Sequence, residues 1–410
     1  MNNTPELLSP AGDLDKMRFG IAYGADAVYM AGTRFGMRAA ATNFDDNALR
    51  EGIAYAHAHG VKCYITVNIM PSNRDLPALP AYLELLQDAG ADALIIADVG
   101  VLRMARRYAP RVPVHISTQT SILNHEAANY WADAGAERIV LARELSLEEI
   151  AEIRAKTPKE LEIEAFVHGA MCISYSGRCL ISQYMTGRDA NHGACAQPCR
   201  WNYSLMEEKR PGQFFPVEED GRGTYLYNSK DMCMIEHVPE LIEAGITSFK
   251  IEGRNKTAYY AACVTGAYRA AIDTYKKDPE NFVLPQFCRD EVNKVSHREY
   301  YTGFYFGNQE NGQHYGDSQY IREYEVVGMP VECDDSGKAV FALKNRFFDG
   351  EELELIQPGQ APYVFRAENV TDDEGTKREL FNVPQMRVHF AFPFKVSEWA
   401  ILRKVKERPE

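Results

Sequence analysis

The chain has 410 residues, 45% of them hydrophobic, and a net charge of −13, a size that accommodates a large core and one small further domain. The negative charge argues against a protein that coats nucleic acid generically, because phosphate binding needs clustered cations, although a local basic track stays possible. No apolar run approaches the roughly 18 residues that span a bilayer. The start, MNNTPELLSPAGD, has neither a basic n-region nor an apolar h-region, so we expect a cytoplasmic protein.

Residues 1–278 alternate short β-rich apolar runs with segments whose apolar residues recur at helical spacing and stop at or near Gly. The eight runs are ELLSPAG, DAVYMAG, CYITVNI, DALIIAD, VHISTQ, RIVLARE, EIEAFVHG and SFKIEGR. Eight βα units predict an α/β fold, a TIM-like (β/α)8 barrel, with an open doubly wound sheet as the alternative. In such barrels the active site lies on the loops that follow the strands.

The loop after the seventh run is far longer than the usual 2–6 residues of a βα connection. That run ends near His168, and the next convincing helix, HVPELIEAG, begins near His237, so about 169–236 form an insertion. The insertion holds five cysteines, and a loop of this length without function would be unusual. They are Cys172, Cys179, Cys195, Cys199 and Cys233.

The pattern changes after the barrel. Residues 279–317 are expected to form a connecting region rich in Gly, Asn and aromatics. Residues 318–404 contain alternating runs separated by turns such as DDSG and DDEG, which predict a small all-β barrel domain. Two basic groups are each expected to be a solvated face or tail rather than an RNA contact: Arg103, Arg106, Arg107 and Arg111, and Arg403, Lys404, Lys406 and Arg408.

The four cysteines from Cys172 to Cys199 are better suited to a metal than to disulfides, because the chain has no export signal. Their spacing alone leaves zinc and an iron–sulfur cluster equally open. Cys233 could replace Cys199 as the last ligand. Cys63 and Cys263 lie in apolar periodic segments and are expected to be buried core thiols.

Charged residues at the strand ends admit two interpretations, because charge inside a barrel is costly unless it is paired or used. One is an internal salt-bridge network, for example Glu252 with Arg254 or Arg143. The other is an anion and substrate site, since Arg binds a carboxylate with two parallel hydrogen bonds. Polar residues also end the fifth run, at Ser117, Thr118 and Gln119.

The stretch from Glu164 to Cys172, followed by Gly177-x-Cys179-x-Ile181-Ser182, resembles the signature of the U32 peptidase or collagenase-like family. ELLSPAGD, NSKDMC, SFKIEGR and the β-rich C-terminal part fit the same family. Within it, the arrangement looks most like the prephenate-dependent tRNA uridine hydroxylases, which begin 5-hydroxyuridine formation at the wobble position, and relatives hydroxylate ribosomal RNA.

This resemblance implies a tRNA-modifying enzyme with tRNA and prephenate as partners and a [4Fe–4S] cluster held by Cys172, Cys179, Cys195 and Cys199, with Cys233 in reserve. For the two carboxylates of prephenate we expect Lys250 and Arg254 first, then Arg38 and Arg178. Weaker candidates for proton transfer are His168, Tyr175 and Glu252.

Two other functions stay open, a peptidase and a non-catalytic iron–sulfur scaffold for a partner hydroxylase. The sequence has no GxSxG elbow and no HExxH zinc pair, since His125-Glu126 lacks the second histidine. His168 and Cys172 could be proposed as a cysteine protease pair. A lone nucleophile, however, does not explain four clustered thiols.

Overall fold

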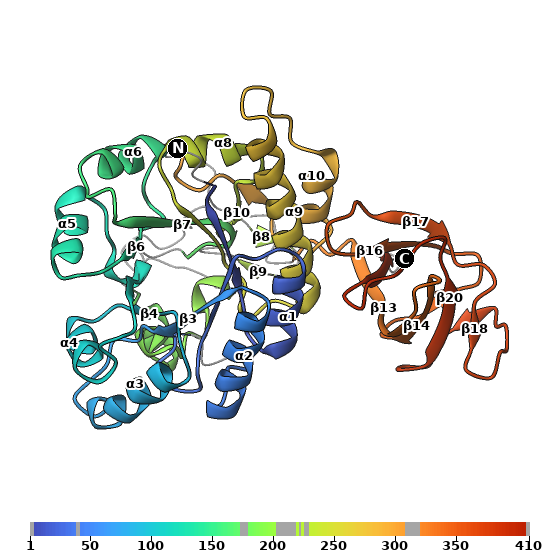
Figure 1. The fold of residues 1–410 in the computed structure, drawn as a ribbon, viewed down its shortest axis with the longest axis horizontal. Coiled ribbons are helices and arrows are strands. Elements are labelled where there is room, and N and C mark those ends of the chain that lie inside the picture. The colour runs from blue at the N-terminus through green and yellow to red at the C-terminus, as the bar shows by residue number, and fades with distance from the viewer. Residues whose placement is uncertain are drawn as a thin grey trace, which may run out of the picture.

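The computed structural model describes residues 4–37, 42–172, 179–201, 219–220, 223–224, 229–307 and 320–406. They form a barrel of strands ringed by helices and, beside it, a β domain that contains the C-terminal strands (Figure 1).

Eight parallel strands form the barrel. They are β1 (Glu6–Pro10), β2 (Ala27–Met30), β3 (Lys62–Val67), β4 (Ala93–Ile96), β5 (Val114–Ile116), β6 (Arg138–Val140), β7 (Glu162–Ala170) and β11 (Ser248–Ile251). β11 closes the ring because it pairs in parallel with both β1 and β7, where Ser248 lies opposite Glu6 on one side and Glu164 on the other. The predicted barrel is thus confirmed, and the open-sheet alternative is wrong.

Helices cover the outside of the barrel (Figure 1). They are α1 (Leu14–Ala22), α2 (Asp46–Ala58), α3 (Leu79–Asp88), α4 (Val99–Tyr108), α5 (His125–Asp133), α6 (Leu147–Ala155), α8 (Val238–Glu243) and α9 (Ala258–Lys277). Local sequence sets their ends: Ser146 and Glu149 form a capping box at the start of α6, and Gly90, with φ 85°, follows α3 in the left-handed conformation that ends many helices. Within the described part of the chain, no helix is long and apolar enough to cross a membrane.

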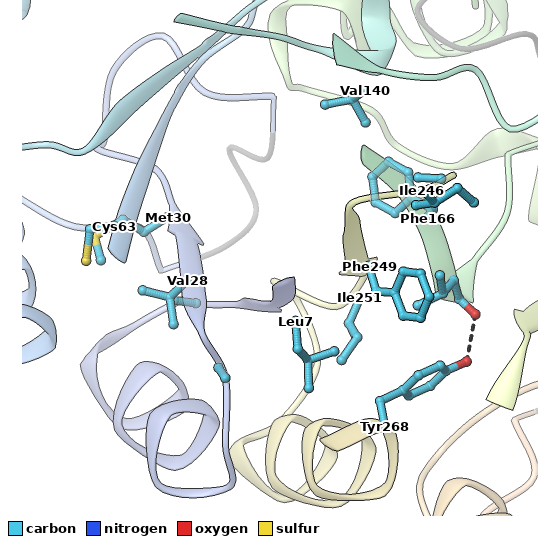
Figure 2. Close-up of a cluster of buried hydrophobic side chains, with 14 of the residues drawn as sticks. Leu7, Val28, Met30, Cys63, Val140, Phe166, Ile246, Phe249, Ile251 and Tyr268 are labelled. Carbon is cyan, nitrogen blue, oxygen red and sulfur yellow. Dashed lines mark hydrogen bonds between the residues drawn. The ribbon is translucent and has the colours of Figure 1, made fainter. Parts of the chain in front are cut away.

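Alternation along the strands divides the core into two layers. Leu7, Val28 and Cys63 belong to the cluster that packs against the helices, whereas their strand neighbours point into the barrel and form a smaller cluster of Leu8, Ala27, Tyr29, Tyr64, Ala93 and Ile95. Figure 2 shows the outer layer, in which the Tyr268 hydroxyl of α9 donates a hydrogen bond of 2.8 Å to the Val167 carbonyl. The predicted core thiols are confirmed, since Cys63 is 0% and Cys263 is 3% exposed.

The long insertion after β7 carries short elements of its own. They are α7 (Ile181–Thr186), the 3-10 turns η3 (Ala190–His192) and η4 (Pro198–Arg200), the strands β8 (Glu219–Asp220), β9 (Gly223–Thr224) and β10 (Asp231–Cys233), and the 3-10 turn η5 (Ile235–His237). Two further 3-10 turns, η1 (Leu76–Ala78) and η2 (Thr118–Thr120), follow β3 and β5. β10 runs antiparallel to β7 and continues the sheet to β12 (Tyr300–Tyr301). Residues 279–317, expected as a connection, therefore supply an extra strand and the helix α10 (Gln286–Asn293).

The C-terminal domain is an antiparallel half-barrel. Its strands are β13 (Tyr324–Cys333), β14 (Lys338–Leu343), β15 (Phe347–Phe348), β16 (Glu352–Ile356), β17 (Tyr363–Arg366), β18 (Thr371–Asp372), β19 (Leu380–Phe381), β20 (Arg387–Ala391) and β21 (Ile401–Val405). Seven of them form one sheet in the order β17-β16-β21-β13-β14-β20-β18, and β15 pairs with β19. A separate hydrophobic cluster, which includes Phe341, Phe381 and Phe390, fills this domain.

A buried ionic contact joins the two parts. Arg403 on β21 is 0% exposed, and its guanidinium donates hydrogen bonds of 2.5 and 2.7 Å to Glu291 of α10 and of 2.6 and 2.8 Å to Glu354 of β16. Lys404 is also buried and pairs with Glu351 at 2.8 Å. The expectation that these C-terminal cations form a solvated tail is wrong for both, because the sheet turns them toward carboxylates. Lys406 is exposed, and Arg408 lies outside the described residues.

Candidate functional site

A cavity of about 880 Å³ lies where the mouth of the barrel meets the C-terminal domain. The barrel contributes residues at or just after the carboxyl ends of its strands, such as Thr118, Arg143, Ala170 and Glu252. The C-terminal domain contributes Tyr324, Met329 and Lys344 among others. This is the end of a βα barrel where active sites form, and here a second domain encloses it from one side.

The four predicted cysteine ligands all line this cavity. Cys172 is the second residue after β7, Cys179 precedes α7, Cys195 follows η3, and Cys199 lies in η4. All four are reduced thiols, and each is at least partly exposed. Tertiary structure thus turns one side of the cavity into a thiol-rich wall.

The thiols are not gathered at ligand distance. Across the described ranges, which include all four cysteines, no three Cys, His, Asp or Glu side chains stand close enough to hold one metal ion. The chemistry of the donor set fits a thiolate-bound cluster, and a cluster would require these thiols to come closer together than they stand here. Residues 173–178, which join the first two, lie outside the described residues.

Cys233 lies in a different environment from the other four. It belongs to β10, opposite His168 of β7, and it does not line the cavity. Burial raises the pKa of its thiol to about 12, which disfavours the thiolate that a metal needs. The geometry therefore favours Cys199 over Cys233 as a fourth ligand.

A smaller cavity of about 70 Å³ lies deeper in the barrel mouth and shares lining residues with the large one. Around it the fold brings together nearly all the polar strand ends that the sequence singled out, from three different strands. They are Ser117, Thr118, Gln119, Arg143, Lys250, Glu252 and Arg254. Arg143, Glu252, Thr118 and Gln119 line both cavities.

Lys250 is held by a carboxylate that the sequence interpretation did not consider. Its Nζ lies 2.5 Å from Oε1 of Glu164, which is 0% exposed. Burial lowers the pKa of the Lys250 ammonium, although the Glu164 carboxylate opposes that shift. An internal salt-bridge network therefore exists, as one interpretation expected, and Glu164 is a member of it that the sequence interpretation did not name.

The network continues below the cavity to the other end of the barrel. Arg138 donates hydrogen bonds of 3.0 Å to Glu164 and 2.6 Å to Glu6, and Tyr64 donates one of 2.6 Å to Glu6. Burial raises the pKa of Glu6, but the charge and hydrogen bond of Arg138 outweigh it and leave the pKa lowered. The alternation of EIE in the seventh run would have identified Glu164 as inward-facing, because every second residue of a barrel strand points inside.

Two arginines face the smaller cavity. Arg254 is 3% exposed, and its Nη1 donates to the Thr66 hydroxyl at 3.1 Å. Arg143 lies with its guanidinium 3.8 Å from the centre of the Phe166 ring, and its Nη1 donates to the Ala170 carbonyl at 2.8 Å. Both guanidinium groups are thus oriented by the barrel before any ligand binds.

His168 lies in the barrel wall, 1% exposed, between two tyrosines. Its ring nitrogens stand 3.5 Å from the Tyr268 hydroxyl and 3.3 Å from the Tyr300 hydroxyl. Burial, helped by the charges of His297 and Lys256, lowers its pKa to about 3, so the ring is neutral at pH 7. Among the described residues it lines neither cavity, which gives no support to a role in activating Cys172.

Three predicted site residues, Arg38, Tyr175 and Arg178, lie outside the described residues. The sequence interpretation missed the lining contributed by the connecting region and the C-terminal domain, such as Tyr320, Arg322 and Lys344. No spacing rule would have found these, because they reach the cavity only through the docking of the second domain.

The fold and its cavities can be compared with known proteins. The model of peptidase family U32 matches residues 12–315, and the model of the peptidase family U32 C-terminal domain matches residues 322–403. A tRNA hydroxylation protein of Bacillus subtilis is 38% identical over 404 residues, which cover 98% of this chain and 95% of that protein. A tRNA hydroxylation protein of Escherichia coli is 37% identical over 90% of both chains. A 23S rRNA 5-hydroxycytidine synthase of Escherichia coli is 40% identical over 80% of this chain but 48% of that protein.

Proposed function

Because the chain belongs to peptidase family U32 and carries that family's C-terminal domain, we propose that it is an enzyme that hydroxylates tRNA. The observation that carries the proposal is the similarity, over nearly the full length of both chains, to proteins named for tRNA hydroxylation. The base we propose is the wobble uridine and the position is C5. The cavity of about 880 Å³ at the barrel mouth is the place where that base would enter.

We further propose a [4Fe–4S] cluster bound by Cys172, Cys179, Cys195 and Cys199. The proposal is supported by the fact that all four thiols line the cavity. When bound, such a cluster would supply one-electron transfer beside the substrate. Zinc, the alternative metal, would bind the same thiolates but carries no redox chemistry.

The smaller cavity supports prephenate as a co-substrate. Prephenate carries two carboxylates, and the guanidinium groups of Arg143 and Arg254 line the smaller cavity. Lys250 adds a positive charge from beneath, partly balanced by Glu164. Glu252 lines both cavities and is our candidate for holding the proton that leaves C5.

Nucleoside mass spectrometry of tRNA tests the proposal. In a deletion strain we expect 5-hydroxyuridine derivatives to fall, wild-type chain to restore them, and a Cys195→Ser variant to fail. Unchanged derivatives in the deletion strain would refute the proposal. Cleavage of a defined peptide by the purified chain, abolished by Cys172→Ser, would instead favour a peptidase.

Iron and sulfide analysis after anaerobic purification tests the cluster separately. We expect about four of each per chain if a [4Fe–4S] cluster is present. Stoichiometric zinc without sulfide would favour the other metal. A third outcome would favour a scaffold for a partner hydroxylase. In that case the purified chain would carry a full cluster but leave tRNA unmodified, and deletion of its gene would still abolish the modification in cells.

A further inference from the structure

The large cavity is positively charged although the chain is strongly acidic. Among the described residues, five cations and two carboxylates, Glu252 and Glu325, line it. The whole chain has a net charge of −13, so this lining differs in the sign of its charge from the chain as a whole. The five are Arg143, Lys256, Arg322, Lys344 and Lys406.

Three cations surround a single aromatic ring where the barrel meets the C-terminal domain. Lys256 Nζ lies 4.4 Å from the centre of the Tyr320 ring, and the guanidinium carbons of Arg298 and Arg322 lie 4.8 and 5.6 Å from it. The negative faces of an aromatic ring attract cations at such distances. We call these four residues the Tyr320 cluster.

Hydrogen bonds hold the Tyr320 cluster in place. Lys256 Nζ donates to the Ser296 carbonyl at 2.9 Å, and Arg322 Nε donates to the Ser296 hydroxyl at 3.1 Å. The buried carboxylate of Asp231 lies 3.9 Å from Lys256 and 3.8 Å from Arg298. Asp231 thus lies beside Lys256 and Arg298, and Arg322 is held through Ser296.

Two lysines of the C-terminal domain line the same cavity. Lys344 follows β14, and its backbone NH donates to the Val327 carbonyl of β13 at 2.8 Å. Lys406 follows β21, and its backbone NH donates to the Glu323 carbonyl at 2.7 Å. The backbones of both lysines are therefore fixed to β13 or the residue just before it, while their side chains are exposed.

We propose that this interdomain cavity binds the phosphate backbone of the RNA strand that carries the target nucleotide. In the Tyr320 cluster, Lys256 after β11 and Arg322 just before β13 bind phosphate, and Lys344 and Lys406 of the C-terminal domain bind it as well. Phosphate contacts position a nucleic acid without reading its sequence, so these residues would set where the strand lies and leave base selection to the barrel mouth. The inference rests on the proposed function, in which the substrate is tRNA.

The test measures equilibrium binding of an unmodified tRNA transcript to the full chain at several salt concentrations, without prephenate. Each phosphate contact removed should lower the slope of log affinity against log salt by about 1. We expect K256Q/R322Q and K344Q/K406Q each to bind more weakly and with a shallower slope. The matched control is R103Q/R107Q, which removes two exposed arginines of α4 outside the cavity and should bind as wild type does.

Far-UV circular dichroism and thermal unfolding of each variant establish that the fold is kept. The Lys344 and Lys406 side chains are exposed, so K344Q/K406Q tests the proposal even if the Tyr320 cluster contributes to stability. If both cavity variants bind tRNA with wild-type affinity and the wild-type slope of log affinity against log salt, this inference is overturned. The proposed function stays intact in that case if hydroxyuridine in cells still depends on the chain. Loss of binding in R103Q/R107Q alone would assign the RNA to α4 and also overturn it. No dependence of hydroxyuridine on the chain would refute the proposed function itself.

Discussion

Replacing Arg403 by Met should destabilise the interface between the barrel and the C-terminal domain. The interface of the variant should then unfold at a much lower denaturant concentration than that of the wild type. The Arg403 side chain is 0% exposed, and its partners Glu291 and Glu354 have side chains only 8% and 13% exposed. Removing one partner of a buried ion pair leaves an uncompensated charge and costs about 3–5 kcal/mol. That is a large fraction of a typical free energy of unfolding of about 5–15 kcal/mol.

Urea denaturation followed by tryptophan fluorescence measures the effect. Trp399 of the C-terminal domain packs edge-on against Phe19 of α1, with ring centres 5.4 Å apart, so it reports on the interface. The matched control is Arg387→Met, because Arg387 pairs with Glu332 in the same domain but is 41% exposed, and exposed pairs contribute little. Similar small losses in both variants would refute the reasoning.

The pH dependence gives a second check. Burial raises the pKa of Glu354, but the charge of Arg403 and hydrogen bonds from Lys294 and Arg403 outweigh it, so the pKa is lower in the folded chain than its ordinary value. A lowered folded pKa contributes stability at neutral pH that is lost as the pH falls through that value. The difference between wild type and Arg403→Met should therefore be largest near neutral pH and shrink below about pH 4. Adding Glu291→Gln and Glu354→Gln to the variant should recover part of the loss, because the unpaired charges are then gone.

Three further outcomes follow from the site. Arg254→Lys keeps the positive charge but loses the planar guanidinium that can bind a carboxylate with two hydrogen bonds. Steady-state kinetics at saturating tRNA should therefore give a higher KM for prephenate. An unchanged KM would show that Arg254 is not part of the prephenate site. His168→Asn should alter thermal stability but not the shape of the pH–rate profile, because the buried ring has a pKa of about 3 and is neutral at all pH values near 7. Loss of an ionisation near neutral pH in the variant's profile would contradict this. Cys233→Ser should keep its iron, measured per chain, whereas most iron should be lost on serine substitution of Cys172, Cys179, Cys195 or Cys199.

The barrel could be predicted from the sequence because its evidence is local. Each strand is a short apolar run and each helix a periodic one, so eight repeats of the pair predict the architecture without knowledge of any long-range contact. The place of the functional site followed from the same reasoning, since an overlong loop after a strand lies at the catalytic end of a barrel. Lys250, Glu252 and Arg254 were predicted to lie at the mouth because they are in or just after the last barrel strand, and the structure places all three there.

Partners that lie far apart in the chain could not be predicted in this way. Lys250 meets Glu164 across 86 positions, and Arg403 meets Glu291 across 112. Each contact depends on which strands become neighbours when the barrel closes and on where the second domain docks. Local patterns in a sequence, such as apolar spacing and turn residues, do not contain that information.

The amino-acid sequence by itself thus determined the barrel, the thiol-rich loop and the polar strand ends, because periodicity and chain adjacency are enough to place them. Only the tertiary structure decided that Arg403 and Lys404 are buried, that Lys406 lines a cavity, and that Cys199 rather than Cys233 lines that cavity with the other thiols. The physical reason is that burial and charge pairing depend on the packing of distant segments, which no local pattern encodes.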